Sequence, residues 1–580
     1  MSFLGVTRSL TGRCWSGPDA ETCRRAEALA RAGGLGDALA RVLARRGVGS
    51  DGLADYLAPT LRALLPDPAG LRDMTRAAAR LCTAVGRKQR IAVFADYDVD
   101  GGASAALLIG WLRDLGREAT LYIPDRLSEG YGPNAPAMAR LAGTHDLILC
   151  VDCGTLAHEA LAAAEAADVI VLDHHLGGET LPPAHAVVNP NRQDEDGALG
   201  HLCAAAVVFL LLVEATRQRR AAGLAGPDLT AMLDLVALAT VADVAPLVGV
   251  NRAFVRQGLR VMARGARPGL AALAGAAGLA GAPAAHHLGF VLGPRINAGG
   301  RIGRADLGAR LMATPDPAEA AALAARLEAL NGERRAVEAA VRAGAERAAG
   351  ALGPEAPLVW AAAPGWHPGV VGIVAARLVE AYGRPAVVLG VEDGVARGSG
   401  RSLPGVDLGR AVQRLATEGL IEKGGGHEMA AGLTLPEAQL GPAMARLGEL
   451  LAGGTPRAAT FALDGTLLPA AATGALLDDL ERAGPFGAGA PAPRFAFPDL
   501  AITHVRRVGA DHLRISARAE DGARLEAIGF GMAAGPVGAA LAGNRGARFH
   551  LAGRLVADRW RGGGQVELRL EDAAHADGRG

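Results

Sequence analysis

The chain has 580 residues, of which half are hydrophobic, and its 60 basic side chains are balanced by 60 acidic ones. This length is too great for one hydrophobic core, so we expect about three or four domains. A net charge of zero gives no general attraction to nucleic acid, although it allows a local basic groove. The apolar residues are dispersed, and no run is long enough to span a bilayer.

The expected compartment is the cytoplasm, with no membrane partner. Residues 1–15 lack the apolar segment of a secretory signal; because they are acid-poor and carry arginine and serine, a transit peptide is the alternative. The six cysteines are few for this length, which is typical of a reducing compartment. Cys150 and Cys153 lie in a predicted strand and at its end without a second pair, so we do not expect a zinc or redox site.

Helical spacing of apolar residues, broken by glycine and proline, predicts a helical lead-in over residues 1–85. From residue 86 onward, predicted strands alternate with predicted helices. The strand sequences are IAVFA (91–95), ATLYI (119–123), LILCV (147–151) and DVIVL (168–172), and the last predicted helix between them runs from Thr155 to Ala166. This alternation predicts an α/β fold with a mostly parallel sheet and right-handed crossovers.

Acidic residues follow three of these predicted strands. They are Asp96, Asp98 and Asp100 after the first strand, Asp152 after the third, and Asp173, His174 and His175 after the fourth. The carboxyl ends of parallel strands share one edge of the sheet, which is where ligands bind in such folds. One solvated acidic turn is an ordinary alternative, but three independent ones would rarely coincide. In an extended chain Asp96 and Asp100 would lie roughly 13 Å apart, so the chain must turn within the motif.

An apolar helical pattern from Leu229 to Ala242 places Asp243 directly after it, either as a site residue or as an accident of the helix end. The following segment, residues 289–306, carries Arg295, Asn297 and Arg301 among glycines. Flexible backbone amides interleaved with guanidinium groups suit phosphate oxygens, and a plain arginine-rich surface loop is the alternative.

Residues 316–349 form one helical pattern of roughly 50 Å, which we expect to bridge two domains, with a possible kink at Gly332. A second α/β unit follows. Its glycine-rich segments at 365–372, 396–402 and 424–432 predict an anion-binding face that contains His367, Ser399, Arg401, Ser402 and His427; ordinary turns are the alternative. The end of the chain is strand-rich and has a mild local excess of arginine between residues 494 and 569, which suits a nucleic-acid backbone.

The carboxylates and imidazoles predict a Mn²⁺ or Mg²⁺ site rather than a thiolate zinc site. Their number exceeds what one ion needs, so we expect two ions, about 3.5–4 Å apart, that activate a water for phosphoester hydrolysis. The sequence contains no Walker-type loop, no Gly-x-Ser-x-Gly elbow and no H-E-x-x-H pair. Phosphoester hydrolysis is the chemistry that uses the most of these residues.

The motifs DYDVDG (96–101), VDCG (151–154), DHH (173–175) and TVADVAPL (240–247) resemble the four acid motifs of the DHH phosphoesterase superfamily. Six further motifs resemble its RecJ family of single-strand-specific 5′→3′ DNA exonucleases: EGYGPN (129–134), GPRINAGGR (293–301), LNGERR (330–335), GSGRS (398–402), GGGHEMAAG (424–432) and PFGAGAP (485–491). The similarity runs in consistent order from residue 20 to residue 570.

The resemblance implies a division of the chain into a lead-in (1–85), a DHH catalytic domain (86–314), a connecting helix (315–350), a DHH-associated domain (351–455) and a C-terminal β-barrel, an OB-fold that binds nucleic acid (456–580). Together these would enclose a channel too narrow for duplex DNA. It also implies Mn²⁺- or Mg²⁺-dependent release of 5′-mononucleotides from single-stranded DNA in repair and recombination. The expected protein partners are a single-strand-binding protein and a RecQ-type helicase.

The resemblance also assigns roles to individual residues. The implied metal ligands are Asp96, Asp98, Asp100, Asp152, His174 and Asp243, with Asp173 and His175 as ligands or as their immediate support. Of these, Asp98, Asp100, Asp152, His174, His175 and Asp243 would be catalytic. The implied phosphate-binding residues are Arg295, Asn297, Arg301, Ser399, Arg401, Ser402 and His427.

Two departures from the family pattern stand out. Residues 202–206 read Leu-Cys-Ala-Ala-Ala where the family has Leu-Cys-Gly-Ala-Gly, and Ala490 replaces an asparagine. The first adds bulk at a helix start, and the second removes a hydrogen-bonding group near the barrel junction. Because neither is a proposed ligand, we expect an effect on fine positioning rather than loss of activity.

Two other functions are alternatives to the exonuclease. One is a DHH phosphoesterase acting on pyrophosphate, short RNA or cyclic dinucleotides; such relatives are shorter and lack the barrel, so the arginine-bearing C-terminal stretch argues against it. The other is a repair scaffold with a relic site, but every acid of the motifs is present.

Overall fold

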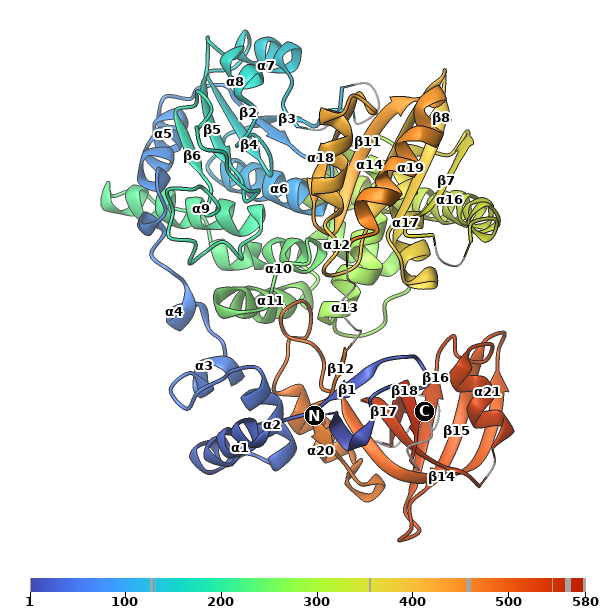
Figure 1. Cartoon of the computed structure of the whole chain (residues 1–580). Coiled ribbons are helices and arrows are strands. Elements are labelled where there is room, and N and C mark those ends of the chain that lie inside the picture. Colours follow the sequence, from blue (N-terminus) through green and yellow to red (C-terminus); the bar gives the residue numbers. More distant parts are fainter. Residues whose placement is uncertain are drawn as a thin grey trace.

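The computed structural model describes residues 2–125, 129–130, 132–353, 356–454, 460–544, 546–558 and 565–576. Two α/β units lie side by side at one end of the molecule, and the barrel lies with helices α1–α3 at the other end (Figure 1). In the described ranges, no helix combines the length and the apolar character needed to cross a membrane. The predicted motif EGYGPN includes Tyr131, which lies outside the described residues.

The first unit contains the predicted parallel sheet. Its strand order is β3-β2-β4-β5-β6, with β2 (Ile91–Ala95), β3 (Ala119–Tyr122), β4 (Leu147–Val151), β5 (Asp168–Leu172) and β6 (Ala186–Val188), all paired in parallel. Every residue of β2 and β4 is buried, which explains their continuous apolar sequences. The four predicted strands are confirmed, and the three-residue β6 was not predicted.

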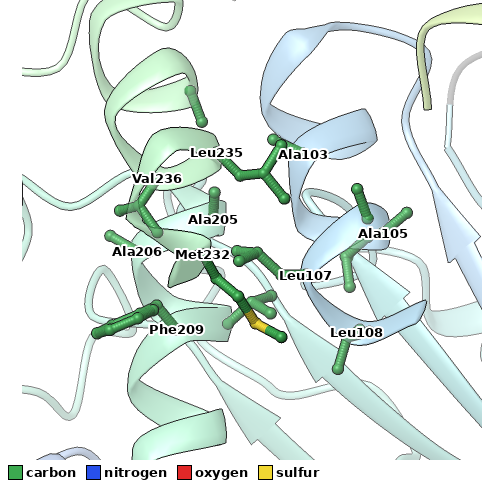
Figure 2. Packing of buried hydrophobic residues seen from close by; sticks show 14 of the residues in the cluster. Ala103, Ala105, Leu107, Leu108, Ala205, Ala206, Phe209, Met232, Leu235 and Val236 are labelled. Atoms are coloured by element: carbon green, nitrogen blue, oxygen red, sulfur yellow. The ribbon is translucent and has the colours of Figure 1, made fainter. Parts of the chain in front are cut away.

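Helices cover both faces of this sheet. One face packs against α5 (Met74–Gly86), α6 (Val99–Asp114) and α9 (Ala204–Ala221), on which α10 (Leu233–Ala242) packs in turn, and the other packs against α7 (Ala135–Ala142) and α8 (His158–Ala162). In Figure 2, Leu107 of α6 lies beside Met232, opposite Ala205 and Phe209 of α9. The helix predicted from Thr155 to Ala166 is therefore shorter than expected, because residues 152–157 form the turn that carries Asp152.

Residues 289–306 are not the flexible loop that their glycines suggested; that prediction was wrong. The segment is helical: a π-helical turn, η4 (Leu288–Leu292), continues into α14 (Gly293–Ile302). The glycines serve close packing instead. A Cβ on Gly300 would lie 2.5 Å from Cδ2 of Tyr97, and a Cβ on Gly303 would lie 2.6 Å from Leu330. Their small size brings α14 against the Asp96–Asp98 turn and against α16.

The remaining helices of this unit are η3 (Leu229–Met232), α11 (Gly249–Met262), α12 (Pro268–Ala276), α13 (Ala285–His287) and α15 (Leu307–Ala313). The long helix is confirmed as α16 (Pro317–Gly350), which begins at an Asp316 side-chain cap. It contributes Leu323, Leu327 and Leu330 to the core of the first unit and Val341 and Ala345 to a core of the second. The helix thus joins the two α/β units.

The second unit is a mixed sheet in the order β10-β11-β9-β8-β7, in which β7 and β8 are parallel and the other pairs are antiparallel. Its strands are β7 (Val359–Pro364), β8 (Ala386–Glu392), β9 (Val395–Arg401), β10 (Lys423–His427) and β11 (Ala430–Pro436), and its helices are α17 (Pro368–Tyr382), α18 (Leu408–Thr417) and α19 (Leu440–Leu451). The glycine-rich segments 396–402 and 424–432 are thus mainly strands, whose amides are used in the sheet.

The C-terminal unit is a closed barrel, as predicted. Strands β13 (Gly465–Thr466), β14 (Phe495–Val508), β15 (His512–Arg518), β16 (Arg524–Gly529), β18 (Val566–His575) and β17 (Arg548–Ala557) follow in this order, and β14 pairs with β17 to close it. Helices α20 (Gly474–Glu481) and α21 (Pro536–Gly543) accompany it.

The N-terminal segment is helical, as predicted, but its parts belong to different cores. Leu39 and Leu43 of α2 (Asp37–Arg45) share a core with Phe495 and Phe549 of the barrel. Strand β1 (Cys14–Ser16) pairs with β12 (Thr460–Ala462) next to the barrel, and α1 (Ala20–Gly33), α3 (Leu53–Leu57) and α4 (Leu61–Leu64) complete the segment. Helix α5 instead packs on the parallel sheet. The five-part division of the chain stays a prediction.

Candidate metal centre

The first acidic motif turns immediately after β2. Asp98 is the N-cap of α6, and its Oδ1 accepts the backbone amides of Asp100 (2.9 Å) and Gly101 (3.1 Å). A Cβ on Gly101 would lie 2.5 Å from the Asp96 carbonyl oxygen, so a glycine is required for the helix to start this close to the strand. The expected turn is present, and it brings the first two aspartates together.

The predicted residues meet at the carboxyl edge of the parallel sheet. Among the described residues, three groups have potential ligand atoms within 4.8 Å of one another: Asp96, Asp98 and Asp152; Asp100, His174 and Asp243; Asp152, His174 and His175. Nε2 of His174 lies 3.3 Å from Oδ1 of Asp152 and 3.7 Å from Oδ2 of Asp100. Since Asp152 and His174 are shared between groups, the arrangement offers adjoining positions for more than one ion.

Asp173 differs from the other acids because protein donors already occupy its carboxylate. Oδ2 accepts the amide (3.1 Å) and the hydroxyl (2.7 Å) of Thr155, while Oδ1 accepts Nδ1 of His175 (2.8 Å) and the amides of His174 (2.8 Å) and His175 (3.2 Å). Burial favours the neutral acid, but these hydrogen bonds outweigh it and hold the pKa of Asp173 below its ordinary value. The hydrogen bond between Nδ1 of His175 and Asp173 also raises the pKa of His175 to about 9. The geometry therefore favours Asp173 as support for the two histidines.

Asp100 is held by the start of α9. Its two carboxylate oxygens accept the amides of Ala204 (2.7 Å) and Ala205 (2.8 Å), at the positive end of that helix. The alanines that depart from the family pattern lie in this helix start, and the side chains of Ala204 and Ala206 are fully buried. The departure therefore affects the packing behind Asp100 and contributes no ligand.

Burial and mutual repulsion make these carboxylates hard to ionise without a cation. Burial, followed by the charges of Asp98, Asp100 and Asp96, raises the pKa of Asp152 well above its ordinary value. Burial and the charges of Asp100 and Asp98 raise the pKa of Asp243 to about 8. A divalent cation removes this penalty, and a set of carboxylate oxygens with one or two imidazoles suits Mn²⁺ or Mg²⁺. The residues present thus fit the predicted metal.

Sequence reasoning missed two residues that directly follow β6 and support the segment with His174 and His175. Asn189 Nδ2 donates to Thr155 Oγ1 and to the His175 carbonyl, both at 2.8 Å, and Asn191 Nδ2 donates to the His174 carbonyl at 2.5 Å. A signal was available, because Asn-Pro-Asn directly follows the short apolar run AVV and ends at the same sheet edge. The run was too short to be recognised as a strand.

Several predicted phosphate-binding residues gather around the start of α17. Arg301 Nη1 donates to the Gly369 carbonyl at 3.1 Å, and a Cβ on Gly372 would lie 3.1 Å from Arg401 Nη2 and 3.3 Å from Ser399 Cβ. Arg401 and His427 both pair with Ala430 of β11, so they lie in one row of the sheet.

Three other predicted phosphate-binding residues differ from this group. Two of them already bind protein groups, and the third has a buried oxygen without a partner among the described residues. Arg295 forms an ion pair with Glu328 of α16. The Ser402 hydroxyl is buried and donates to the Val406 carbonyl at 2.7 Å. Asn297 Oδ1 is buried and has no hydrogen-bond partner among the described residues. All of these phosphate-binding roles stay predictions.

Comparison with known families and proteins agrees with this architecture. Residues 90–240 match the DHH family N-terminal domain, residues 355–453 the DHHA1 domain and residues 463–572 the RecJ OB domain. A single-stranded-DNA-specific exonuclease RecJ from Dickeya dadantii is 38% identical over 505 residues, covering 82% of this chain and 86% of the relative. The one from Escherichia coli is 36% identical over 562 residues, covering 92% and 95%.

Solved structures show the same similarity. The crystal structure of RecJ in complex with Mn²⁺ from Thermus thermophilus superimposes with a TM-score of 0.81 at 31% identity, covering 96% of this chain and 79% of that one. The corresponding Mg²⁺ complex gives a TM-score of 0.74 at 30% identity, covering 97% and 78%. The fold, the three matched domains and the extent of these alignments establish that the chain belongs to the RecJ family of the DHH proteins.

Proposed function

We propose that this protein is an exonuclease that hydrolyses single-stranded DNA from its 5′ end with Mn²⁺ or Mg²⁺ and releases 5′-mononucleotides in repair and recombination. One observation carries the chemistry: Asp152 and His174 belong to adjoining groups of metal-ligating side chains at the carboxyl edge of one sheet. The family relationship supplies the substrate, since the relatives are single-stranded-DNA-specific exonucleases.

The ligand sets follow from the geometry. Asp96, Asp98 and Asp152 would hold one cation, and Asp100, His174 and Asp243 would hold the other. When bound, such a pair supplies an activated water and offsets the charge that develops on the scissile phosphate and on the leaving oxygen.

His175 is the residue that we assign to proton donation. Its Nδ1 donates to Asp173 at 2.8 Å, and in the metal-free protein this bond raises the pKa of His175 to about 9, which favours the cationic, proton-donating form of the imidazole. Its side chain remains 45% exposed beside the buried ligands, where a substrate can reach it. This combination suits protonation of the leaving 3′ oxygen.

The start of α17 is the proposed position of the 5′ phosphate. Arg301 comes to it from α14, and Ser399 and Arg401 come to it from β9. A terminal phosphate held here by guanidinium groups would set the strand end relative to the metal centre and so impose the 5′ polarity.

The barrel supports a long substrate rather than a dinucleotide or pyrophosphate. Its outer surface carries a hollow of about 210 Å³ lined by His504, Arg506, Arg514, Ser516 and Glu526 from three adjacent strands. This face of an OB-fold is where single strands bind. Removing the barrel would uncover the core it shares with α2, so the test is the double substitution His504→Gln and Arg506→Gln at exposed positions of β14, which leaves the ion pairs of Arg514 with Asp558 and Glu567 in place. Unchanged turnover of long strands by that variant would favour a short substrate.

The decisive experiment uses strands labelled separately at the 5′ and 3′ ends, single- and double-stranded, with and without Mn²⁺. We expect immediate release of the 5′ label as mononucleotide from single strands only, and only with metal. Release of the 3′ label first, or equal attack on blunt duplex, would refute the proposal. Loss of turnover in Asp152→Asn with retained binding of single strands would assign the activity to the metal centre.

The partners are proposed from the family resemblance: a single-strand-binding protein and a RecQ-type helicase. Titration of each purified partner into the full chain, followed by light scattering, tests this directly. A stoichiometric complex is expected with the single-strand-binding protein. Absence of any change in mass with both partners would refute this part of the proposal.

A further inference from the structure

The turn that carries Asp243 is packed against a loop from the C-terminal unit. We call residues 243–248 the ligand turn and residues 485–491 the docking loop. The Leu247 amide donates to the Ala488 carbonyl at 2.8 Å, and a Cβ on Gly489 would lie 3.1 Å from Cβ of Pro246. Ala490 is 1% exposed and belongs to the core of the catalytic unit rather than to the barrel core. The docking loop thus reaches out of its own unit (Figure 1).

The amides of residues 243–245 are held by carbonyls of α10, whereas Pro246 and Leu247 are held from outside that helix. Val244 has a left-handed backbone conformation (φ 59°), which is costly for a β-branched residue. On one side, Asn251 Nδ2 donates to the Pro246 carbonyl at 3.0 Å. On the other side, the docking loop accepts the Leu247 amide through the Ala488 carbonyl. A turn that is strained and held from both sides changes its geometry when one support is lost.

A buried arginine fastens the docking loop to the catalytic unit. Arg252 of α11 is 2% exposed, and its guanidinium donates to the carbonyls of Ala483 (3.0 Å), Gly484 (2.8 Å) and Pro485 (3.4 Å). The same group lies 3.7 Å from the ring centre of Tyr56 and donates to that residue's carbonyl at 3.2 Å. Carbonyl oxygens at several positions fix the loop entrance more rigidly than one carboxylate would. Arg46 adds bonds to the Ala483 and Pro491 carbonyls.

We propose that the docking loop, fastened by Arg252, positions Asp243 for metal binding, so that the barrel unit is a working part of the metal centre as well as a grip for DNA. This inference rests on the proposed function only in assigning Asp243 as a ligand. Arg252, Ala488 and Gly489 are positioning residues, because they act on the ligand through the turn.

The test compares two glycine-to-alanine variants of the full chain. Gly489→Ala introduces a side chain at φ +67° against Pro246, whereas Gly509→Ala introduces one at φ +62° in the β14–β15 turn, where the only described atom within 4 Å is His512 Cδ2 at 3.9 Å. Both carry the same backbone strain, and only the first disturbs the ligand turn. Mn²⁺ affinity is measured by titration followed by electron paramagnetic resonance, together with Tm.

We expect Gly489→Ala to weaken Mn²⁺ binding about tenfold at the position formed by Asp100, His174 and Asp243, as loss of support behind a ligand does. Excess Mn²⁺ should restore the turnover of this variant. Gly509→Ala should lower Tm about as much as Gly489→Ala does but keep the wild-type affinity for Mn²⁺. Equal Mn²⁺ affinities in both variants would overturn the inference. Failure of the wild-type chain to bind Mn²⁺ would instead overturn the proposed function, and this inference with it.

A second pair of variants covers the case in which Gly489→Ala does not fold. Arg252→Lys keeps the charge but loses most of the donors to the Ala483, Gly484 and Pro485 carbonyls at the entrance of the docking loop, and it should weaken Mn²⁺ binding. Arg256→Lys is the matched control, because Arg256 lies one turn further along α11 and donates to the Leu57 carbonyl, outside the docking loop. The same Mn²⁺ affinity in both lysine variants would also overturn the inference.

Discussion

Nδ1 of His175 lies 2.8 Å from Oδ1 of Asp173, and this one carboxylate also accepts both backbone amides of the histidine pair. Asp173, the first residue of the DHH motif, therefore supports the two histidines that follow it. Its carboxylate holds Nδ1–H of His175, which aims that imidazole, and it fixes the backbone of both histidines.

Asp173→Asn should lower turnover about 10–100-fold, the usual effect of removing a partner behind a ligand. The amide cannot accept the same set of donors, and it removes the charge that raises the pKa of His175 to about 9. Histidine resonances followed by NMR against pH in metal-free protein should show the pKa of His175 moving down toward its ordinary value. An unchanged titration would contradict the assigned hydrogen bond.

Asn189→Ala should weaken Mn²⁺ binding and turnover about 10–100-fold, because it frees the His175 carbonyl and the Thr155 hydroxyl from their donor. The unpaired buried groups should also cost about 1–3 kcal/mol of folding free energy. Asn544→Ala is the control, since that exposed side chain only donates to the Ala540 carbonyl at the end of α21. Equal Mn²⁺ affinities in the two variants would argue against a supporting role for Asn189.

Gly300→Ala should impair metal binding more than stability. The added methyl group would lie 2.5 Å from the ring of Tyr97, between two predicted ligands, and must displace it. Gly332→Ala in α16 is the contrast, because no described atom lies within 4 Å of the added methyl group. It should raise the free energy of unfolding by about 0.5–1 kcal/mol and leave turnover unchanged. The Mn²⁺ titration and urea unfolding of both variants check the pair.

The stabilisation that Mn²⁺ gives should grow with pH. The pKa of Asp243 is raised from 3.8 to about 8, so the metal-free fold gains stability from this proton at low pH and loses it as pH rises through 8. Metal binding must displace this proton, which by itself makes Mn²⁺ affinity rise by up to about tenfold per pH unit between pH 6 and 8. The increase of Tm with MnCl₂ at pH 6, 7 and 8 measures this. A constant increase would contradict a protonated Asp243.

The parallel sheet and the gathering of acidic residues at its edge could be predicted from the sequence because the signals are local. Buried strands such as Leu147–Val151 are uninterrupted apolar runs, and the acids that follow them must share one sheet edge. Asp96 needed a turn to reach the same place, and the turn brings a carboxylate oxygen of Asp96 within 4.8 Å of those of Asp98 and Asp152, while its role as a ligand stays a prediction.

What the sequence did not reveal depends on contacts between distant segments. The glycines of α14 looked like a flexible loop, and only the approach of Tyr97 explains Gly300. Strand β6 is too short to be recognised alone, so Asn189 was missed. The sharing of a core between Leu39 and the barrel strand residue Phe495 has no local signature at all.

Anomalous diffraction from crystals soaked in Mn²⁺ would show directly whether the strand ends and α10 build a two-ion centre. We expect two peaks about 3.5–4 Å apart. One should lie among Asp96, Asp98 and Asp152, and the other among Asp100, His174 and Asp243. A single peak away from these residues, or no peak at a Mn²⁺ concentration that supports turnover, would contradict the two-ion centre.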